Sequence, residues 1–387
     1  MTAHARARVT GRGAARWARG HPWIYRSDVA QRPDGPAGAV VVEDPRGRVI
    51  GCALWSPSSE ISLRMLTRDD RAIDDAFWAD RIGRAVARRR GLDGTAFRAV
   101  HGEGDGLPSL IADVLDRYVV VQLLSAGLEA HRHAIVAALR EHLDPLGVLA
   151  RNDVPVRRRE ELPESVELLW GDVPEWVEVR EGPIRYRAAP WTGQKTGAFL
   201  DQRENRLLAG ELARGRALDA FSFHGSFALN MARSADEVVA VDSSADALEH
   251  ARANAALNGI RNITTVEANA FDLLREQESA GERYDTIVLD PPAFAKHRAS
   301  VRSALRGYKE INLRGLRLLR AGGHLLTFSC SYHITEADFA AMLEDAAADA
   351  GRPVRWVRWL GQSPDHPRVL QIPESGYLKG AVLQALE

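Results

Sequence analysis

The chain has 387 residues, more than twice the roughly 150 of a typical domain, so we expect two or three domains. Apolar residues make up 45% of the chain and charged residues 27%, which excludes a wholly disordered or collagen-like protein. Lysine plus arginine number 51 and aspartate plus glutamate 52, so the formal net charge of -1 gives no overall sign of a nucleic-acid or membrane partner.

Cysteine usage and the amino terminus indicate the compartment. Cys52 and Cys330 are too few for a disulfide framework or a four-cysteine zinc site, and they suggest a reducing environment. The first twenty residues are rich in arginine and lack the apolar core of a secretory signal. No apolar run approaches the roughly 20 residues needed to span a bilayer. We therefore expect a cytoplasmic protein with no membrane partner.

The neutral total conceals a basic amino-terminal region. Residues 1–32 carry seven arginines and one acid, Asp28, a formal charge of +6. Two interpretations remain open: a solvated arm, or a surface that contacts phosphates. Residues 39–66 contain short β-rich runs separated by turns, which predicts a small β domain. Residues 74–90 have helical spacing with one basic side, and this helix should end at Gly91.

A glycine-rich stretch at 102–108 superficially resembles a nucleotide-binding loop. Such a loop must open a helix, whereas residues 110–124 have strand character, so the stretch over 98–124 favours two strands joined by a hairpin loop. A helix over 128–143, an arginine-rich loop at 157–159 and a hairpin over 177–187 complete a middle α+β unit that ends near Pro190.

From Leu207 onward, helical and apolar strand-like segments alternate. This alternation predicts a mainly parallel, doubly wound sheet that binds ligands at the carboxyl ends of its strands. The predicted strands are 217–221, 237–242, 263–267, 284–290 and 323–329. The chain is therefore predicted to be α/β with three domains: a small β domain over 1–72, a central α+β domain over 73–190 and a doubly wound domain over 191–387.

The first strand of this sheet breaks into a turn around Asp219 and Gly225 before a helix begins. The next strand ends in Asp242, at the position where an acid can accept hydrogen bonds from a ribose diol. The spacing fits a nucleoside cofactor. An acid at a strand end is also often only a helix cap, so the signal is moderate by itself.

A later strand ends in the run Asp290-Pro291-Pro292-Ala-Phe294. Consecutive prolines fix the backbone and remove donors, so the acid and the carbonyls form a rigid acceptor edge for the N–H groups of a base. Phe294 is positioned to stack on such a base. The alternative is a rigid turn after a buried strand.

Cys330 lies at the carboxyl end of the last predicted strand and is flanked by hydroxyl residues. If this strand neighbours the one that ends in Asp290, both groups project into one crevice. Its place at a strand end favours a reactive thiol, whereas Cys52, inside an apolar run, is expected to serve packing.

Several runs resemble, in order and spacing from about residue 7 to the end, the PUA-domain-containing, S-adenosylmethionine-dependent 23S ribosomal RNA (cytosine-5) methyltransferases of the large-subunit branch. His21-Pro-Trp-Ile-Tyr-Arg26 resembles the opening of their PUA domain, and the loop at 102–108 resembles their central-domain loop. The other matching runs are 192–206, 219–227, 290–294, 307–312, 328–331, 365–367 and 377–380. The resemblance implies an RNA-binding PUA-like domain, then the central domain, then a Rossmann-like class I methyltransferase domain.

The resemblance also implies S-adenosyl-L-methionine as cofactor, large-subunit ribosomal RNA as partner, and the roles of individual residues. The cofactor is expected to contact Asp201, Gln202, Arg203, Asp219, Phe221, Ser222, Gly225, Asp242, Asn269, Ala270 and Asp290. Within this set, residues 201–203 would close over the methionine end, Asp242 would hold the ribose, and residues 269–270 would border the adenine. Relatives often have an acid in place of Asn269. The residues implied for substrate binding are Pro291, Pro292, Phe294 and Arg26.

Cys330 and Asp290 are the catalytic residues that this family's chemistry requires. Carbon 5 of cytosine becomes nucleophilic only after a thiolate adds at carbon 6, and Cys330 is the candidate thiol. Asp290 would stabilise the charge that the addition places on the ring. A proline occupies the position where many such enzymes have a second cysteine, which implies a one-cysteine mechanism. A paired target base would first have to be turned out of its helix.

Two other functions remain open. The Asp-Pro-Pro run also fits methylation of a guanine or adenine ring nitrogen or amino group, which needs no thiol. A non-catalytic RNA-binding ribosome-assembly factor could use the same fold. No metal is expected, because the sequence contains neither a His-Glu-x-x-His nor a Cys-x-x-Cys motif. The two amino-terminal domains could also form a homodimer.

Overall fold

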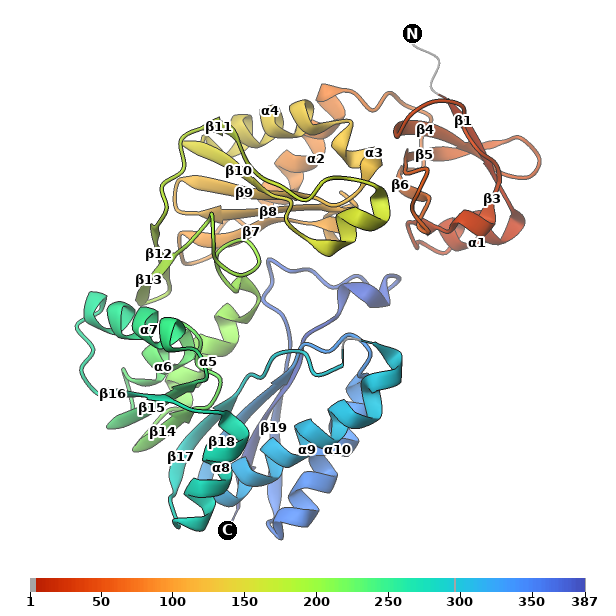
Figure 1. Cartoon of the computed structure of the whole chain (residues 1–387). Helices are drawn as coiled ribbons and strands as arrows, with labels where there is room; N and C mark the ends of the chain where they lie inside the picture. Colours follow the sequence, from red (N-terminus) through yellow and green to blue (C-terminus); the bar gives the residue numbers. More distant parts are fainter. Residues whose placement is uncertain (1–4, 296, 387) are drawn as a thin grey trace. The chain divides into compact units, whose positions relative to one another are not determined.

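The computed structural model describes residues 5–295 and 297–386. These residues form two compact units (Figure 1). The first unit contains the described part of Met1–Val179 together with Ala188–Leu200 and Pro364–Ser375. The second unit contains Arg180–Arg187, Asp201–Ser363 and the described part of Gly376–Glu387. The chain therefore passes between the two units several times.

The first unit begins with a six-stranded sheet in the order β2-β6-β5-β4-β1-β3. Its elements are β1 (Arg6–Val9), α1 (Gly11–Ala18), β2 (Trp23–Ile24), β3 (Val29–Gln31), β4 (Gly38–Glu43), β5 (Val49–Trp55) and β6 (Leu63–Thr67). The expected small β domain is present. The described part of the amino-terminal region is not an extended arm, because β1 pairs with β4 and both Arg6 and Arg8 form ion pairs with Glu43.

A second sheet of the first unit has five strands in the order β11-β10-β9-β8-β7. Its strands are β7 (Ala96–His101), β8 (Leu110–Leu115), β9 (Tyr118–Leu123), β10 (Gly147–Arg151) and β11 (Val166–Gly171). The glycine-rich stretch joins β7 to its antiparallel partner β8, which confirms the hairpin loop. The segment 110–124 is two strands rather than one, because the backbone turns at Asp116 with a φ of 54°.

The helices of this unit follow the predicted pattern with two differences: the helix expected over 74–90 ends earlier, at Ala87, and the one expected over 128–143 is interrupted. They are α2 (Asp75–Ala87), α3 (Ala126–Glu129) and α4 (Arg132–Leu143). Asp74 caps α2 by accepting a hydrogen bond from the backbone N–H of Phe77, and the helix buries Phe77, Trp78, Ile82 and Ala85. The single helix expected over 128–143 is broken at His131, where α3 has already ended. The hairpin over 177–187 is present as β12 (Val177–Glu181) and β13 (Ile184–Ala188).

The second unit is built on a seven-stranded sheet in the order β16-β15-β14-β17-β18-β20-β19. The strands are β14 (Arg216–Asp219), β15 (Glu237–Asp242), β16 (Ile263–Glu267), β17 (Tyr284–Leu289), β18 (Leu319–Ser329), β19 (Val354–Leu360) and β20 (Lys379–Ala385). The first five are parallel neighbours, which confirms the doubly wound prediction. The sequence did not lead us to expect β19 and β20, which extend the sheet in antiparallel fashion.

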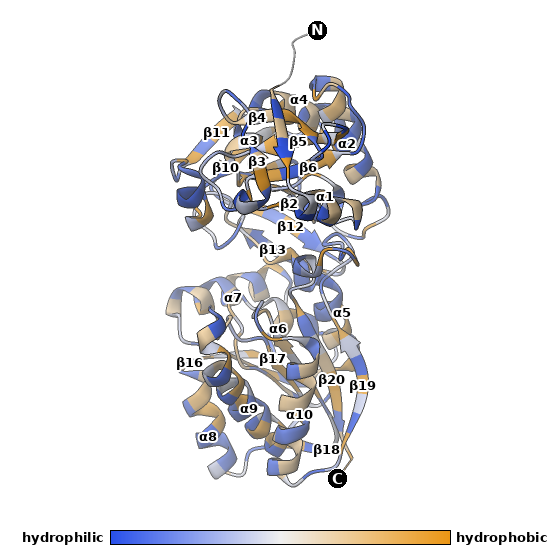
Figure 2. Ribbon diagram, turned by 90° about the vertical axis from the view of Figure 1, so that its right-hand side faces the viewer, coloured by the Kyte–Doolittle hydropathy of each residue, from blue (hydrophilic) through white to orange (hydrophobic). Residues whose placement is uncertain are grey.

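Helices cover both faces of this sheet (Figure 1). They are α5 (Arg203–Leu212), α6 (Ser226–Met231), α7 (Ala245–Leu257), α8 (Ala270–Ser279), α9 (Val301–Leu318) and α10 (Glu336–Ala350). Buried residues of α8, α9 and α10 pack on one face, and those of α5 and α6 pack on the other. Figure 2 shows hydrophobic and hydrophilic residues alternating along α9 and α10, as expected of helices that bury one side. Across the described ranges, no helix combines the length and apolarity that a membrane span requires.

The hairpin of β12 and β13 is tied to the second unit by a buried ion pair. Arg206 on α5 donates from Nε and Nη2 to the two carboxylate oxygens of Glu181, at 2.7 and 2.6 Å. Both side chains are almost fully buried. The two buried charges compensate each other, which makes the pair sensitive to loss of one partner.

We expect Arg206→Ala to lower the free energy of unfolding by about 3–5 kcal/mol, because it leaves the Glu181 carboxylate buried without its cation. Thermal unfolding followed by circular dichroism measures this. Arg84→Ala is the matched control: its partner Asp80 is one turn away on the surface, and its loss should cost less than about 1 kcal/mol. Equal shifts for the two variants would contradict the assignment.

Candidate active site

Three predicted motifs meet at the carboxyl edge of the second unit's sheet. β14 pairs in parallel with β15 on one side and with β17 on the other, and β17 pairs with β18. The register places Leu289 opposite Thr327, so the segments that follow these two residues leave the sheet side by side. Asp290 and Cys330 therefore project from neighbouring strand ends, as the sequence predicted. Asp219 and Asp242 end the other two strands.

Asp219 is fully buried at the end of β14. Its Oδ2 accepts a hydrogen bond from the backbone N–H of Ala228 at 3.0 Å, while Oδ1 has no hydrogen-bond partner among the described residues. Burial raises the pKa of Asp219 from 3.8 to about 7, and the nearby Ser222 hydroxyl and Ala228 N–H oppose the rise. Asp290 and Asp242 add to the shift, which shows that the three carboxylates share one electrostatic environment.

Asp242 fixes the loop that follows β14. Its Oδ2 accepts from the backbone N–H of Phe223 and its Oδ1 from that of Ser244, each at 2.9 Å. Phe223 has a φ of 48°, a conformation that non-glycine residues seldom adopt, and the hydrogen bond to Asp242 helps to hold it. The carboxylate that was predicted to hold a ribose therefore also shapes the loop around it.

Gly225 is needed for packing as well as for conformation. Its φ is 86°, and a Cβ at this position would lie 3.0 Å from the Cβ of Ala251 on α7. The missing side chain thus faces a helix of the protein. Ser222 is buried in the same loop, and Phe221 packs partly buried against the sheet's core.

Asn269 caps α8, and Ala270 is the first residue of that helix. The Asn269 Oδ1 accepts from the backbone N–H of Phe271 at 2.9 Å. Because the oxygen serves the cap, the amide nitrogen is the polar group that Asn269 can offer a nucleobase. An acid at the same position would have a second acceptor oxygen instead of this donor.

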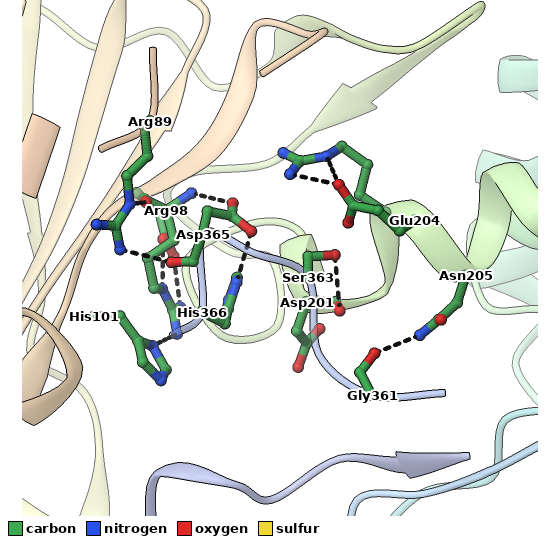
Figure 3. Close-up of polar contacts among 12 residues, drawn as sticks. Arg89, Arg98, His101, Asp201, Glu204, Asn205, Gly361, Ser363, Asp365 and His366 are labelled. Carbon is green, nitrogen blue, oxygen red and sulfur yellow. Dashed lines mark hydrogen bonds and ion pairs between the residues drawn. The ribbon is translucent and has the colours of Figure 1, made fainter. Parts of the chain in front are cut away.

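Gln202 reaches across to Asp290. Its Nε2 donates to Asp290 Oδ1 at 3.0 Å, and its own Oε1 accepts from Asn205 Nδ2 at 2.6 Å. Asn205 also donates to the backbone oxygen of Gly361 at 2.9 Å (Figure 3). These linked hydrogen bonds fix which end of the Gln202 amide faces Asp290. Sequence reasoning missed Asn205, although its place one helical turn after Gln202 was a visible signal.

The other two residues of the 201–203 segment have different partners. The carboxylate of Asp201 accepts from the Tyr377 hydroxyl at 2.7 Å, and its backbone oxygen accepts from the N–H and hydroxyl of Ser363. Arg203 is buried and donates to Glu204. The structure therefore brings Gln202 directly to the predicted catalytic acid, and it uses Asp201 to anchor the segments before and after residues 364–375.

The residues of the Asp-Pro-Pro loop differ in their exposure to solvent. Pro291 is buried and Pro292 is exposed. Phe294 is half-buried and packs against Tyr308, with ring centroids 4.5 Å apart, and against Phe271, at 5.7 Å. Part of its ring surface is therefore used by the protein's own aromatic cluster.

Cys330 follows β18 in a half-buried position. The next residue, Ser331, is fully buried, and its Oγ accepts from the backbone N–H of Ala295 and pairs with the Tyr308 hydroxyl. Its backbone oxygen accepts from the Nζ of Lys379 at 2.9 Å. Burial raises the pKa of Tyr308, so this hydroxyl stays protonated. The thiol thus lies on a turn that several elements hold in place.

Comparison with known proteins agrees with this geometry. A family model described as S-adenosylmethionine-dependent methyltransferase matches residues 97–381, and a PUA-like domain model matches residues 7–68. The ribosomal RNA large subunit methyltransferase I of Shewanella amazonensis is 40% identical over 94% of this chain and 95% of its own length. The protein of the same name from Tolumonas auensis is 39% identical over 95% of this chain and 96% of its own length.

The chain belongs to the S-adenosylmethionine-dependent methyltransferase family. Among solved structures, a methyltransferase candidate from Streptococcus mutans has the same fold, with a TM-score of 0.81 and 20% identity over 98% of this chain and 99% of that one. A similar structure, with a TM-score of 0.82 and 20% identity over the same shares of the two chains, was determined in complex with SAH. The PUA-like domain model identifies the amino-terminal β domain as PUA-like.

The methyltransferase site fits S-adenosylmethionine, its cofactor. The cofactor presents a ribose diol, an adenine amine and an ammonium group, which donate hydrogen bonds, and a sulfonium, which nearby negative charge stabilises. The strand ends supply three carboxylates, Asp219, Asp242 and Asp290, and the Asp219 Oδ1 is a buried acceptor that the described residues leave without a hydrogen bond. A buried acceptor of this kind is costly unless a ligand satisfies it.

Two residues singled out from the sequence lie elsewhere in the methyltransferase. Cys52 is buried in the core of the first unit, with its Sγ near the backbone oxygens of Asp69 and Arg71, and burial raises its pKa. It packs as expected. Arg26, predicted to bind substrate, belongs to the PUA-like domain, where it pairs with Glu60 and donates to the backbone of Ser58.

The Asp365-His366 run belongs to the first unit. The Asp365 carboxylate accepts from the backbone N–H of Arg98 and contacts the Nδ1 of His366, and its backbone oxygen accepts from Arg89 (Figure 3). Burial lowers the pKa of the neighbouring His101 to about 2. The run therefore anchors residues 364–375 in that unit. Within the described ranges, no group of three or more His, Cys, Asp or Glu side chains is arranged to hold a metal.

We expect the pH dependence of stability to report on Asp219. In the folded protein its pKa is about 7 rather than 3.8, so between about pH 4 and 7 the folded state keeps a proton that the unfolded chain releases. Wild-type stability should fall through this range as pH rises, while Asp219→Asn should lack this contribution. The Tm of the variant should therefore rise relative to wild type from pH 4.5 to 7.5.

Differential scanning fluorimetry at several pH values measures the effect. Asp236→Asn removes an exposed carboxylate and should keep the wild-type pH dependence. Parallel Tm curves for wild type and Asp219→Asn would show that Asp219 does not titrate in this range.

Proposed function

We propose that this methyltransferase modifies carbon 5 of a cytosine in large-subunit (23S) ribosomal RNA through a covalent adduct with Cys330. The observation that supports the proposal is that Asp290 and Cys330 follow neighbouring parallel strands, β17 and β18. A methyltransferase that acts on a base nitrogen has no use for a thiol at this point. The names of the relatives, large-subunit ribosomal RNA methyltransferase I, support the RNA class.

The reaction requires activation of an unreactive carbon. The Cys330 thiolate forms a bond to carbon 6 of the cytosine, and the ring electrons move toward N3, which leaves carbon 5 nucleophilic. Bound S-adenosylmethionine supplies the methyl group as an electrophilic carbon. A base then removes the carbon 5 proton, the bond from sulfur to carbon 6 breaks, and the thiolate is regenerated.

In the proposed reaction Asp290 stabilises the activated ring. In the proposed step its carboxyl group enters with one proton, donates this proton toward N3 and accepts from the cytosine amino group, which compensates the charge that the thiolate addition creates. Gln202 donates to one Asp290 oxygen and so fixes the rotation of the carboxylate, which directs the other oxygen. The residues of this chain therefore orient the acid before the substrate arrives.

The PUA-like domain and the basic residues of the first unit are inferred to hold the RNA while the target base is turned out of its stack. Arg6, Arg8 and Arg12 form ion pairs within this domain, yet their side chains remain exposed. These arginines can therefore also contact phosphates. We infer that the enzyme acts in the cytoplasm, where its RNA partner is made.

Cys330→Ala should reduce methyl transfer by at least about 10³-fold, because it removes the nucleophile, and it should leave S-adenosylmethionine binding within about twofold. The assay uses tritiated-methyl transfer to ribosomal RNA from cells that lack this gene, with calorimetry for cofactor binding. Cys52→Ala is the control and should retain activity.

The same assay separates the rival functions. Mass analysis of nucleosides from the wild-type reaction should give 5-methylcytidine. Substantial transfer by Cys330→Ala, or a nitrogen-methylated product, would favour the base-nitrogen reaction. Absence of S-adenosylmethionine binding by the wild-type protein would instead favour a non-catalytic assembly factor.

A further inference from the structure

Tyr308 on α9 contacts both loops that carry the proposed catalytic groups: the Asp-Pro-Pro loop (residues 290–295) and the cysteine turn (residues 329–334). Its side chain is fully buried, and its hydroxyl pairs with Ser331 Oγ at 3.0 Å. The same Oγ accepts from the backbone N–H of Ala295 at 3.1 Å. A hydroxyl has one donor and two lone pairs, so Ser331 can serve both partners at once. One serine oxygen therefore joins α9 to the residue after Cys330 and to the Asp-Pro-Pro loop.

The ring of Tyr308 supports the Asp-Pro-Pro loop at a second point. It packs against Phe294, with ring centroids 4.5 Å apart and an interplanar angle of 40°. The preceding residue on α9 is Gly307, and a Cβ at this position would lie 3.3 Å from the Cδ2 of Phe294. The Phe294 ring therefore lies close to the backbone of α9, and Gly307 and Tyr308 together set its position.

The same segment of α9 is itself held from within the helix. Asn312, which is also fully buried, donates from Nδ2 to the backbone oxygen of Tyr308 at 2.8 Å. The run 307–312 was singled out in the sequence but otherwise has no part in the proposed reaction. Its contacts lead to the two loops of the site.

The Tyr308 hydroxyl is not needed to fill the core. Phenylalanine would occupy nearly the same volume in this apolar cluster and would bury no polar group. A buried hydroxyl needs a partner, and here the partner is the serine that follows the proposed nucleophile. The hydroxyl, rather than the volume of the ring, therefore connects α9 with the cysteine turn.

We propose that Tyr308 is a positioning residue for the proposed reaction: its hydroxyl holds the cysteine turn through Ser331, and its ring holds Phe294 for the target base. The turn is closed across Cys330, because the backbone N–H of Ser331 donates to Ser329 Oγ at 3.4 Å. Since both loops share one junction, the thiol and the stacking ring keep a fixed separation, which orients the base for attack. The inference deepens the proposed function, on which its meaning for catalysis rests.

Hydrogen exchange tests the junction without RNA or cofactor. In full-length Tyr308→Phe, which keeps the ring, peptides that cover 293–295 and 329–334 should exchange at least about threefold faster than in the wild type, because the shared hydrogen bond is lost. Tyr284→Phe is the matched control. Tyr284 is equally buried, and its hydroxyl donates to Gln277 at the opposite end of β17 from Asp290. This control should leave both peptides unchanged.

Steady-state kinetics separate the hydroxyl of Tyr308 from its ring. Tyr308→Phe should lower kcat for methyl transfer by about tenfold and leave KM for the RNA within about threefold, because it disturbs the thiol and keeps the support of Phe294. Gly307→Ala should instead raise KM by about fivefold or more, because the added Cβ displaces the Phe294 ring.

Ser331→Ala removes the same junction from its other side. If the two hydroxyls act as one unit, the double variant Tyr308→Phe, Ser331→Ala should have a kcat within about twofold of that of Ser331→Ala alone. Independent roles would make the two reductions multiply. Thermal unfolding and S-adenosylmethionine binding check that each variant is folded.

The outcomes separate this inference from the proposed function. Unchanged exchange in both peptides of folded Tyr308→Phe would overturn the inference, as would a lower Tm with an unchanged kcat, or reductions in kcat that multiply. If exchange rises in both peptides but the wild-type enzyme makes no 5-methylcytidine, the junction between the loops stands and the proposed reaction fails. If Tyr308→Phe does not fold, exchange in Ser331→Ala decides.

Discussion

The parallel pairing of β17 with β18 is the constraint on which the site depends. Parallel strands end at the same edge of a sheet, so Asp290 and Cys330 come together although forty residues separate them in the chain. The buried core on both faces of these strands holds the register, because a slip of one residue would exchange the side chains that face the two helix layers. The packing of the sheet core therefore fixes the relative positions of Asp290 and Cys330.

Hydrogen bonds between the polar side chains at this edge of the sheet orient them. Asn205 orients Gln202, which in turn orients Asp290, and Ser331 joins the Asp-Pro-Pro loop, α9 and β20 around the cysteine turn. Asn205, Gln202 and Ser331 are buried and Asp290 is half-buried, so their polar atoms need partners, and that requirement restricts where these side chains point. Preorganisation of this kind lowers the cost of reaching the transition state.

The sequence by itself predicted much of the fold and indicated which side chains to propose as the main groups of the site. Helical spacing predicted α2, and apolar runs ending in acids predicted β15 and β17 to within one residue. It also distinguished the two cysteines, because a thiol inside an apolar strand packs, whereas one at a strand end is accessible. These features are local, so they can be recognised without knowing what lies next to them.

Tertiary structure decided which residues support those groups. Nothing in the local pattern around Lys379 shows that its ammonium meets the peptide after Cys330, because the two are brought together only by the antiparallel addition of β20 to β18. The same holds for Asp201, whose partners Ser363 and Tyr377 flank a segment that belongs to the other unit. It also holds for the basic amino terminus, which pairing with β4 makes part of a sheet. Contacts between distant segments carry no periodic signature, so only the folded chain reveals them.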